Sequence, residues 1–533
     1  MYYIQNISKK ISINYHDTNF MKGISTLIGA VLINFLVGAI YSLCTLAVYE
    51  ISYIKGRGGS IEIEHLTFYY PIEIFFQCIS AFTSGFIYKK IGLHRTNFIG
   101  VSILSFGYYM MYLSSNLLMD IFSIILGGIG TGIILYPSTT NSYEWFPEHN
   151  GIIVGIMETS ISLGSFFFAF IGEKIVNRKE IPSHDSDNLY DFDIGKRIKI
   201  YLLVQIISLI SIFLLSLILM YEKVKKYQID NNTRIKNDDN EKETFENLED
   251  KDNDITNFEK IKKINEKIGI GINLNINGNN EITPIKEDSP ERLVKFVLNK
   301  NKLNKKGHIQ NNFNESKTDS IKKILKIAMR SNRLLLFSII VILEAPVSNM
   351  AFTLYREIGE YEKINIKYLQ LIGSLYFIFE CLSSLVFGIL CDYIKLKNLL
   401  LLINGVGTII GLTYCLTFKF GFIFFLVQNI LSFSAGGYYP VKDCFLMQVF
   451  GKDIYIELSG FVSFVVALTV NIITPITYIV LSNLENKELA YWILFLSFGS
   501  LNLIGTILNC FLDESPIDLN KLIKDKNKKN YKI

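Results

Sequence analysis

Twelve apolar runs, each long enough to cross a bilayer as a helix, most constrain what this chain of 533 residues can fold into. A transmembrane helix needs about 20 apolar residues, and it satisfies its own backbone hydrogen bonds where water is absent. The first six runs cover about 25–49, 66–88, 97–115, 121–144, 151–173 and 198–221. The second six cover about 333–355, 368–391, 398–417, 420–443, 455–481 and 489–511. The sequence therefore predicts an all-α membrane protein with 12 transmembrane helices that contact the lipid bilayer.

The composition agrees with a membrane protein and argues against an enzyme. Hydrophobic residues make up 50% of the chain, and the 39 Phe and 30 Tyr are expected for lipid-facing surfaces and interfacial belts. The polar segments contain no convergent nucleophile–base pair and no metal-ligand set, so no catalytic residue, cofactor or metal is predicted. The net charge of +4 is small, and no nucleic-acid partner is predicted.

Five segments follow from the pattern. Residues 1–24 form a polar N-terminal segment without a cleavable signal peptide, and residues 513–533 form a basic tail. Residues 25–221 and 331–512 form two halves of six helices each. The linker between them, 222–330, is rich in Asn, Lys, Glu and Asp, and it is predicted to be disordered because it has too few apolar residues to bury.

The distribution of Lys and Arg near the span ends predicts the orientation in the membrane. One side collects basic residues from the N-terminal segment, the loops after the second and eighth spans, the start of the linker and the tail. The segment 174–199 is an exception, because it carries several basic residues on the other side. We therefore expect both termini and the linker to face the cytosol, in the plasma membrane or an organelle membrane.

An internal repeat relates the two halves. Gly388 lies 303 residues after Gly85, and each follows the second span of its half. Tyr439 likewise lies 303 residues after Tyr136, and a proline follows each tyrosine in the fourth span of its half. Because two independent landmarks share one offset, the sequence predicts duplicated six-helix halves.

A glycine-rich hairpin stands out at residues 127–164. Two apolar flanks surround a short polar hinge at 144–151, and their small residues allow close helix packing. The hairpin contains Pro137 and Glu158. Both are tolerated within a membrane where a helix faces protein or water rather than lipid.

These features resemble the major facilitator superfamily, and within it the oxalate/formate antiporter-like branch, which is akin to monocarboxylate transporters. Residues 27–30 and 34–42 carry the resemblance in the opening helix, and residues 128–132, Tyr136-Pro137 and 145–147 carry it in the hairpin, with Gly151, Gly155 and Gly164-Ser165. The resemblance implies two pseudo-symmetric six-helix halves, a substrate site between them near the midplane, alternating access and a monomeric transport unit.

The same resemblance identifies candidate substrate-binding tyrosines. In this branch, tyrosines of the first, fourth and tenth spans surround small carboxylates and donate hydrogen bonds to them. Those spans offer Tyr41, Tyr136, Tyr438 and Tyr439 here. Ordinary packing is the alternative for each of the four.

The superfamily's loop motif after the second span, Gly-x-x-x-Asp-Arg/Lys-x-Gly, is altered. Gly85, Lys90 and the later glycine fit, but Lys89 stands where the motif has Asp. The second copy keeps Gly388 and Asp392 and lacks the later glycine. We predict that Lys89, Lys90 and Asp392 belong to a cytoplasmic gate; a solvated loop is the alternative.

The substrate of the branch's namesake is not carried over. Oxalate-type transporters resemble one another in a cation in span eight and another in span eleven, which together bind a dianion. Span eight offers Glu380 here, and span eleven has no Lys or Arg between residues 458 and 481. A monoanion, a zwitterion or a cation therefore stays open.

Among the carboxylates within the predicted spans, Glu158, Glu344 and Glu380 are the candidates for chemistry in the cavity. A charged carboxylate at a helix centre costs roughly 2.5–3.5 kcal/mol on insertion scales, so each needs compensation. Each either faces the substrate or a proton in the cavity, or is a neutral acid hydrogen-bonded between helices. Glu344 precedes Ala345-Pro346, which predicts a broken, cavity-lining helix or a packing kink. Glu73, early in the second span, is placed closer to an interface.

Lys442 is the strongest cation candidate in the second-half spans. It attracts an anionic substrate if it faces the cavity, and it snorkels to the cytosolic surface if it lies near the end of its span. We favour snorkelling. Adjacent residues point about 100° apart on a helix, so Lys442 need not pair with Asp443.

The sequence thus predicts a secondary active transporter of a small organic solute, with a monocarboxylate or related organic anion first and proton coupling through the intramembrane carboxylates. The predicted substrate-binding residues are Tyr41, Tyr136, Glu158, Glu380, Tyr438 and Tyr439. The predicted coupling or gating residues are Glu344, Lys89, Lys90, Asp392 and Lys442. A transporter of an amino acid or other metabolite with the same fold, and a non-transporting membrane sensor, are the alternatives.

Overall fold

The computed structural model describes residues 18–59, 69–179, 189–222 and 323–518, and every described segment is helix, turn or extended connection without a strand. The first half contains α2 (Thr18–Gly56), α3 (Tyr69–Ile91), α4 (Leu93–Leu113), α5 (Leu117–Trp145), α6 (Asn150–Val176), the one-turn α7 (Phe192–Gly195) and α8 (Ile198–Leu219). The second contains α12 (Asn332–Tyr361), α13 (Ile366–Cys391), α14 (Leu396–Thr413), α15 (Gly421–Phe450), α16 (Tyr455–Asn483) and α17 (Lys487–Asn509). The short 3-10 helices Tyr414–Thr417 and Lys452–Ile454 flank α14 and α16.

Twelve of these helices coincide with the twelve apolar runs, which confirms the all-α, twelve-helix prediction. Ten helical segments of the described chain are apolar and long enough to cross a membrane by composition alone. The two that fall short, α3 and α4, carry Lys89 and Lys90 or Arg95 near one end. Most of the predicted linker, with its polar composition, lies outside the described residues.

Small residues bring helix backbones together within the first half. The two helices of the predicted hairpin, α5 and α6, pack mainly on other helices rather than on each other, and α6 packs on α2. A Cβ added at Gly38 of α2 would lie 2.3 Å from the carbonyl oxygen of Ile161 on α6. A Cβ added at Gly164 of α6 would lie 2.2 Å from the carbonyl oxygen of Phe35 on α2. Any larger side chain at either glycine would therefore push α2 and α6 apart.

The proline-containing helices continue through their prolines. Pro137 lies inside α5, Pro346 inside α12 and Pro440 inside α15. The prediction that Ala345-Pro346 breaks the seventh span is wrong, because α12 runs from Asn332 to Tyr361 without interruption. A proline is tolerated inside such a helix because neighbouring helices and local adjustment satisfy the carbonyl it leaves free.

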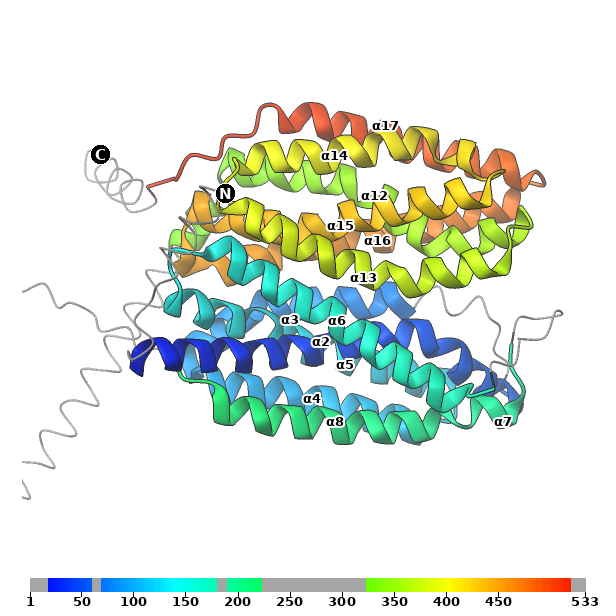
Figure 1. Ribbon diagram of the computed structural model, residues 1–533, viewed down its shortest axis with the longest axis horizontal. Coiled ribbons are helices and arrows are strands. Elements are labelled where there is room, and N and C mark those ends of the chain that lie inside the picture. The colour runs from blue at the N-terminus through cyan, green and yellow to red at the C-terminus, as the bar shows by residue number, and fades with distance from the viewer. Residues whose placement is uncertain (1–17, 60–68, 180–188, 223–322, 519–533) are drawn as a thin grey trace, which may run out of the picture. The chain divides into compact units, whose positions relative to one another are not determined.

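The two halves meet along two pairs of helices, α6 against α13 and α3 against α16 (Figure 1). A Cβ at Gly388 of α13 would lie 2.5 Å from the Cα of Gly155 on α6. A Cβ at Gly460 of α16 would lie 2.5 Å from the backbone nitrogen of Phe82 on α3. The offset of 303 residues relates α3 to α13 and α6 to α16, so the two pairs are equivalent by the repeat.

Candidate functional site

A cavity of about 210 Å³ lies between the two halves, lined from ten helices. Its volume is below the roughly 300–1,000 Å³ usual for drug-sized ligands, so it suits a small solute. Its polar lining residues include Tyr41, Gln77, Tyr136, Glu158, Glu344, Asn349, Tyr376, Glu380, Asn404, Tyr438, Tyr439, Lys442 and Ser463. All six residues predicted to bind substrate line this one cavity, together with Glu344 and Lys442 of the predicted coupling set.

Lys442 is buried in the cavity wall instead of snorkelling to a surface. Its ammonium Nζ lies 3.2 Å from Asp443 Oδ1, within an ion pair whose side chains are 4% and 1% exposed. The ammonium also donates to Ser463 Oγ at 3.1 Å and to Tyr136 OH at 3.4 Å. The favoured snorkelling prediction is therefore wrong, because an adjacent carboxylate and two hydroxyls compensate the charge inside the protein.

Two hydroxyl donors on another helix, α16, hold the carboxylate of Asp443. Tyr455 OH donates to its Oδ2 at 2.7 Å, and Ser459 Oγ donates to its Oδ1 at 2.5 Å. Both donors lie at the start of α16. The carboxylate therefore has its charge and its acceptor positions satisfied by protein groups, and it anchors Lys442 in one orientation.

The three N–H groups of the Lys442 ammonium point to Asp443, Ser463 and Tyr136. The Tyr136 and Ser463 hydroxyl oxygens also lie 2.9 Å apart, within hydrogen-bond distance. Such a set of one cation and two adjustable hydroxyls can exchange its internal hydrogen bonds for bonds to an incoming carboxylate. The arrangement joins α5 of the first half to α15 and α16 of the second.

Two carboxylates face the cavity from opposite halves, Glu158 on α6 and Glu380 on α13. They lie at the same level, because Thr159 Oγ1 donates to the carbonyl oxygen of Cys381 at 3.1 Å. Among the described residues neither carboxylate forms an ion pair with Lys442, whose partner is Asp443. The cavity thus holds acidic groups that are not neutralised by a direct ion pair.

Three further polar groups complete the lining. Glu344 accepts a hydrogen bond from the side-chain amide of Asn404, so it is held between α12 and α14. Tyr41 OH donates to Gln77 Oε1 at 2.7 Å, which joins α2 to α3. The hydroxyl of Tyr438 is buried and has no hydrogen-bond partner among the described residues, so it is available to a bound solute.

The predicted gate residues lie at one end of the bundle, which we call the Asp392 end. Asp392 accepts hydrogen bonds from the backbone N–H groups of Gly151 at 2.8 Å and Ile152 at 3.1 Å. Lys89 forms an ion pair with Glu457 at 2.6 Å. Both contacts join one half to the other. Lys90 is exposed, and no ion pair is found for it in the described part of the chain.

Sequence reasoning missed several of these groups. Ser463 and Asn404 have no signal beyond a polar residue in an apolar helix, and such residues are frequent in this chain. Glu457 stands in the first turn of α16, a position where acids are common for local reasons. Only the contact with Lys89 distinguishes it.

An all-helical chain in which two repeated halves enclose one polar cavity has the architecture of the major facilitator transporters. Two family matches agree, one for each half. Residues 326–530 match the family described as Major Facilitator Superfamily, and residues 67–271 match the family described as Sugar (and other) transporter. The fold and the two matches together support an integral membrane transporter of the major facilitator type, a class whose members are not enzymes.

Particular relatives are distant. The chain is 25% identical over 167 residues, 31% of its length, to the Escherichia coli (strain K12) "Uncharacterized MFS-type transporter YhjX". It is 27% identical over 129 residues, 24% of its length, to the "MFS-type transporter opdF" of Penicillium oxalicum. The matched parts span 39% and 30% of these two relatives.

Solved structures share the fold over nearly the whole chain. The proton:xylose symporter XylE is similar with a TM-score of 0.57 and 13% identity, over 94% of this chain and 98% of that one. The human organic anion transporter MFSD10 is similar with a TM-score of 0.53 and 12% identity, over 93% and 100%. The E. coli fucose:proton symporter FucP is similar with a TM-score of 0.54 and 12% identity, over 92% and 99%.

Proposed function

We propose that the chain is a secondary active transporter that moves a small organic solute with a carboxylate group, first a monocarboxylate, together with a proton. The observation that carries this proposal is the Lys442 ammonium at the cavity wall, bonded to Tyr136 and Ser463. In the described part of the chain, Lys442 is the one Lys or Arg among the lining residues. The assignment to the monocarboxylate branch rests on the motifs of the first, fourth and fifth spans.

In this mechanism the solute carboxylate exchanges places with the hydroxyls around Lys442. Its oxygens accept hydrogen bonds from the ammonium and from the Tyr136 and Ser463 hydroxyls, and Tyr438 supplies a further donor. The bonds to Asp443 from α16 keep Lys442 from following the solute. A buried cation with prearranged donors binds an anion without the cost of ordering long side chains.

The proton is carried by the acids on the two sides of the cavity. Glu158 and Glu380 lie on helices that touch across the interface between the halves. An anionic solute beside two ionised carboxylates would be repelled, so binding favours their protonated forms. Opening to the other side hydrates these acids, releases the proton and lets the solute leave. The contacts at the Asp392 end, predicted to face the cytosol, break in that step.

A second candidate is a zwitterionic solute such as an amino acid. The cavity offers Glu158, Glu344 and Glu380 against one ammonium that already has a carboxylate partner. An amino acid would place its carboxylate near Lys442 and its ammonium near Glu158 or Glu380. The acids would then bind the solute directly and would not need to be neutral.

Uptake into vesicles separates these candidates. The full-length protein is reconstituted, and uptake of radiolabelled lactate and leucine is followed with and without an inward proton gradient. We expect lactate uptake that depends on the gradient and that falls at least tenfold in Lys442→Gln, since a hydrogen bond to a charged group contributes about 1.5–3 kcal/mol. The matched control is Lys419→Gln, because Lys419 is an exposed lysine 3.9 Å from Glu488, away from the cavity.

The possible outcomes distinguish an anion transporter from an amino-acid transporter and from a sensor. Leucine uptake without lactate uptake, lost in Glu158→Gln, establishes the amino-acid alternative. Transport of either solute that is equally fast in Lys442→Gln and in the wild type contradicts the proposed site. Absence of flux for these and other small solutes, with specific binding through residues 222–330, favours the sensor.

A further inference from the structure

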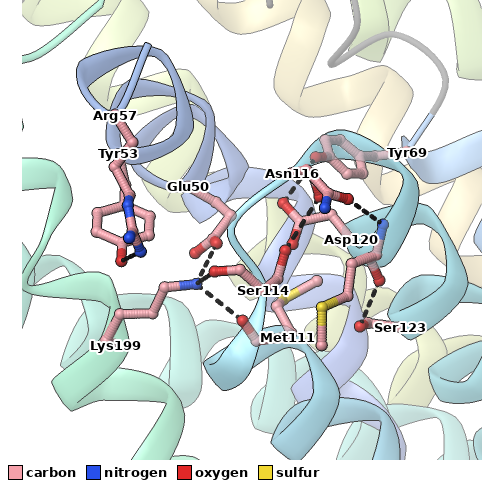
Figure 2. Close-up of polar contacts among 11 residues, drawn as sticks. Glu50, Tyr53, Arg57, Tyr69, Met111, Ser114, Asn116, Asp120, Ser123 and Lys199 are labelled. Carbon is pink, nitrogen blue, oxygen red and sulfur yellow. Dashed lines mark hydrogen bonds and ion pairs between the residues drawn. The ribbon is translucent and has the colours of Figure 1, made fainter. Parts of the chain in front are cut away.

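A second group of buried charges lies inside the first half, near the end of the bundle opposite Asp392. Glu50 of α2, Lys199 of α8, Tyr69 of α3 and Asp120 of α5 converge there from four helices (Figure 2). Glu50 is 3% exposed and Asp120 is 0% exposed. We propose that this group, the Glu50 cluster, takes up protons and passes them through the first half to the central cavity, apart from the path of the solute.

Lys199 is fixed to one of the two acids. Its ammonium forms an ion pair with Glu50 Oε1 and donates to the carbonyl oxygens of Met111 at 2.8 Å and Ser114 at 3.1 Å. The ring of Tyr53 lies 4.7 Å from the same ammonium. Glu50 and the two carbonyl oxygens at the end of α4 together use all three N–H groups of Lys199, so none is left for Asp120.

Among the described residues, neutral hydroxyl donors hold Asp120, and no ion pair is found for it. Tyr69 OH donates to its Oδ2 at 3.3 Å, and its Oδ1 has no hydrogen-bond partner among the described residues. The Oε2 atom of Glu50 is also buried without a partner. Two buried acids therefore share one ammonium. Electrical balance requires that one of the two carboxyl groups carries a proton, since an uncompensated buried charge is costly.

A small cavity lies beside the cluster, against helix α3, which also lines the central cavity. It measures about 20 Å³, room for one water molecule, and it is lined by Glu50, Tyr69 and Glu73 among apolar side chains. Glu73 is 1% exposed and lies one helical turn before Gln77. Gln77 lines the central cavity and accepts a hydrogen bond from Tyr41.

Helix α3 therefore lies between the two cavities, with the carboxyl group of Glu73 on the side of the small cavity. Tyr69 and Glu73 face the small cavity, and Tyr70 and Gln77 face the central one. In the proposed transfer, Glu73 first gives its proton to water in the central cavity beside Gln77. An O–H bond of Glu50 then breaks as an O–H bond re-forms on Glu73, through one water in the small cavity, and Asp120 and Glu50 share the proton that replaces it. The cluster then regains its proton from water outside the bundle. No solute needs to enter this path, because the small cavity is too narrow for one.

Glu50 has few charged and titratable neighbours. Within the described chain, the groups that face Glu50 are Lys199 from α8, Asp120 from α5, and Tyr69 and, across the small cavity, Glu73 from α3. Helix α4 offers the carbonyl oxygens of Met111 and Ser114 to Lys199. On α2 itself, exposed Arg57 bonds to Tyr53 at 2.9 Å rather than to either acid. The proton therefore has Glu50 and Asp120 as its two acceptors in this cluster.

Infrared spectroscopy of the full-length protein in vesicles tests the proton directly, through the C=O stretch of protonated carboxyl groups at neutral pH. We expect Asp120→Asn to lose the signal of one such group, because Glu50 alone then balances Lys199. We expect Lys199→Met to gain the signal of one group, because neither acid retains a cation. The matched control Ser123→Ala removes only a hydroxyl bonded to Met119 on the same helix, and its spectrum should equal the wild type. A wild-type spectrum in Asp120→Asn overturns the proposal.

The transfer is tested by uptake, and this arm rests on the proposed transport function. With radiolabelled lactate or leucine, we expect gradient-driven uptake to fall about tenfold in Asp120→Asn and in Glu73→Gln, while exchange of labelled for unlabelled solute without a gradient stays within twofold. Equal loss of exchange and driven uptake, or no loss of either, overturns the route. If the wild type moves neither solute, the proposed function fails, and the infrared result still decides whether the cluster holds a proton.

Discussion

The two contacts that join the halves at the Asp392 end occupy equivalent positions of the repeat and use opposite charges. Asp392 lies 303 residues after Lys89, the same offset that relates Gly388 to Gly85. Asp392 accepts hydrogen bonds from the first N–H groups of α6. Lys89 instead binds the carboxylate of Glu457 in the first turn of α16 and the carbonyl oxygen of Asp453 just before it. One repeat position thus carries an anion in one half and a cation in the other.

The difference follows from the polarity of helix ends. A helix N-terminus carries a partial positive charge and unsatisfied N–H groups, so it stabilises Asp392 without any further side chain. The same helix end disfavours an ammonium. The buried carboxylate of Glu457, which is 0% exposed, makes the electrostatic potential at the N-terminus of α16 negative at Lys89. The change from Asp to Lys in the loop motif is therefore compensated by a carboxylate on the facing helix.

The largest effect is expected from Lys89→Asp. This substitution places a carboxylate against buried Glu457, and breaking a buried ion pair costs about 3–5 kcal/mol. The Asp392 end should then open, seen as a longer distance between spin labels at His149 and Tyr393. The double variant Lys89→Asp/Glu457→Gln should restore the short distance, because it copies the Asp392 contact at α16. A double variant as open as the single one would show that helix polarity does not govern this contact.

The next effect is expected from Gly388→Ala. Its Cβ would meet the Gly155 Cα at 2.5 Å, and a backbone atom inside a helix cannot move aside. Overpacking of this kind costs about 1–3 kcal/mol. The equivalent Gly85→Ala would meet Glu457 Oε1 at 2.6 Å, the end of a side chain, which can move by less than its ion pair with Lys89 spans and still keep that pair. The spin-label distances should therefore change more for Gly388→Ala than for Gly85→Ala, and the reverse order would contradict the equivalence drawn here.

The helices and the repeat could be predicted because both depend on short stretches of sequence. Apolar runs fix the spans, and one shared offset relates Gly85 to Gly388 and Tyr136 to Tyr439. The position of Lys442 could not be predicted in the same way. Its hydroxyl partners come from other helices, and Tyr136 lies 306 residues away in the chain. Compensation across helices leaves no periodic signal in the sequence, so the sequence alone favours a snorkelling lysine.

Lys199 shows that partners on other helices also limit the prediction of orientation from charge. The basic residues of 174–199 contradict the charge distribution that predicts orientation. For Lys199 the structure gives the reason, because its charge is paired with Glu50 inside the bundle and does not act as a surface charge. A count of Lys and Arg cannot separate a buried, paired cation from an exposed one. The carboxylates of the central cavity were identified because an acid within an apolar run is conspicuous without any knowledge of its partner.

A smaller effect is expected from Asp392→Asn. The amide keeps an acceptor for the N–H of Gly151 or Ile152 but loses the charge that the α6 end stabilises. The charge at a helix end contributes about 0.3–1 kcal/mol, which corresponds to a shift of about two- to fivefold between closed and open forms. Asp392→Ala removes the acceptor as well and should shift the populations further. The spin-label distance distribution measures both, and equal shifts would assign the whole effect to the hydrogen bonds.

The smallest effect is expected from Lys90→Ala, although Lys90 matches the superfamily motif and Lys89 does not. Adjacent residues on a helix point about 100° apart, so only one of the two lysines can face α16. Lys89 does so, and Lys90 is exposed at the end of α3. An exposed charge without a fixed partner contributes little, typically below about 0.5 kcal/mol. The label distances in Lys90→Ala should therefore match the wild type. A shift as large as that of Lys89→Asp would mean that positive charge as such closes this end, and that the ion pair with Glu457 is not the cause.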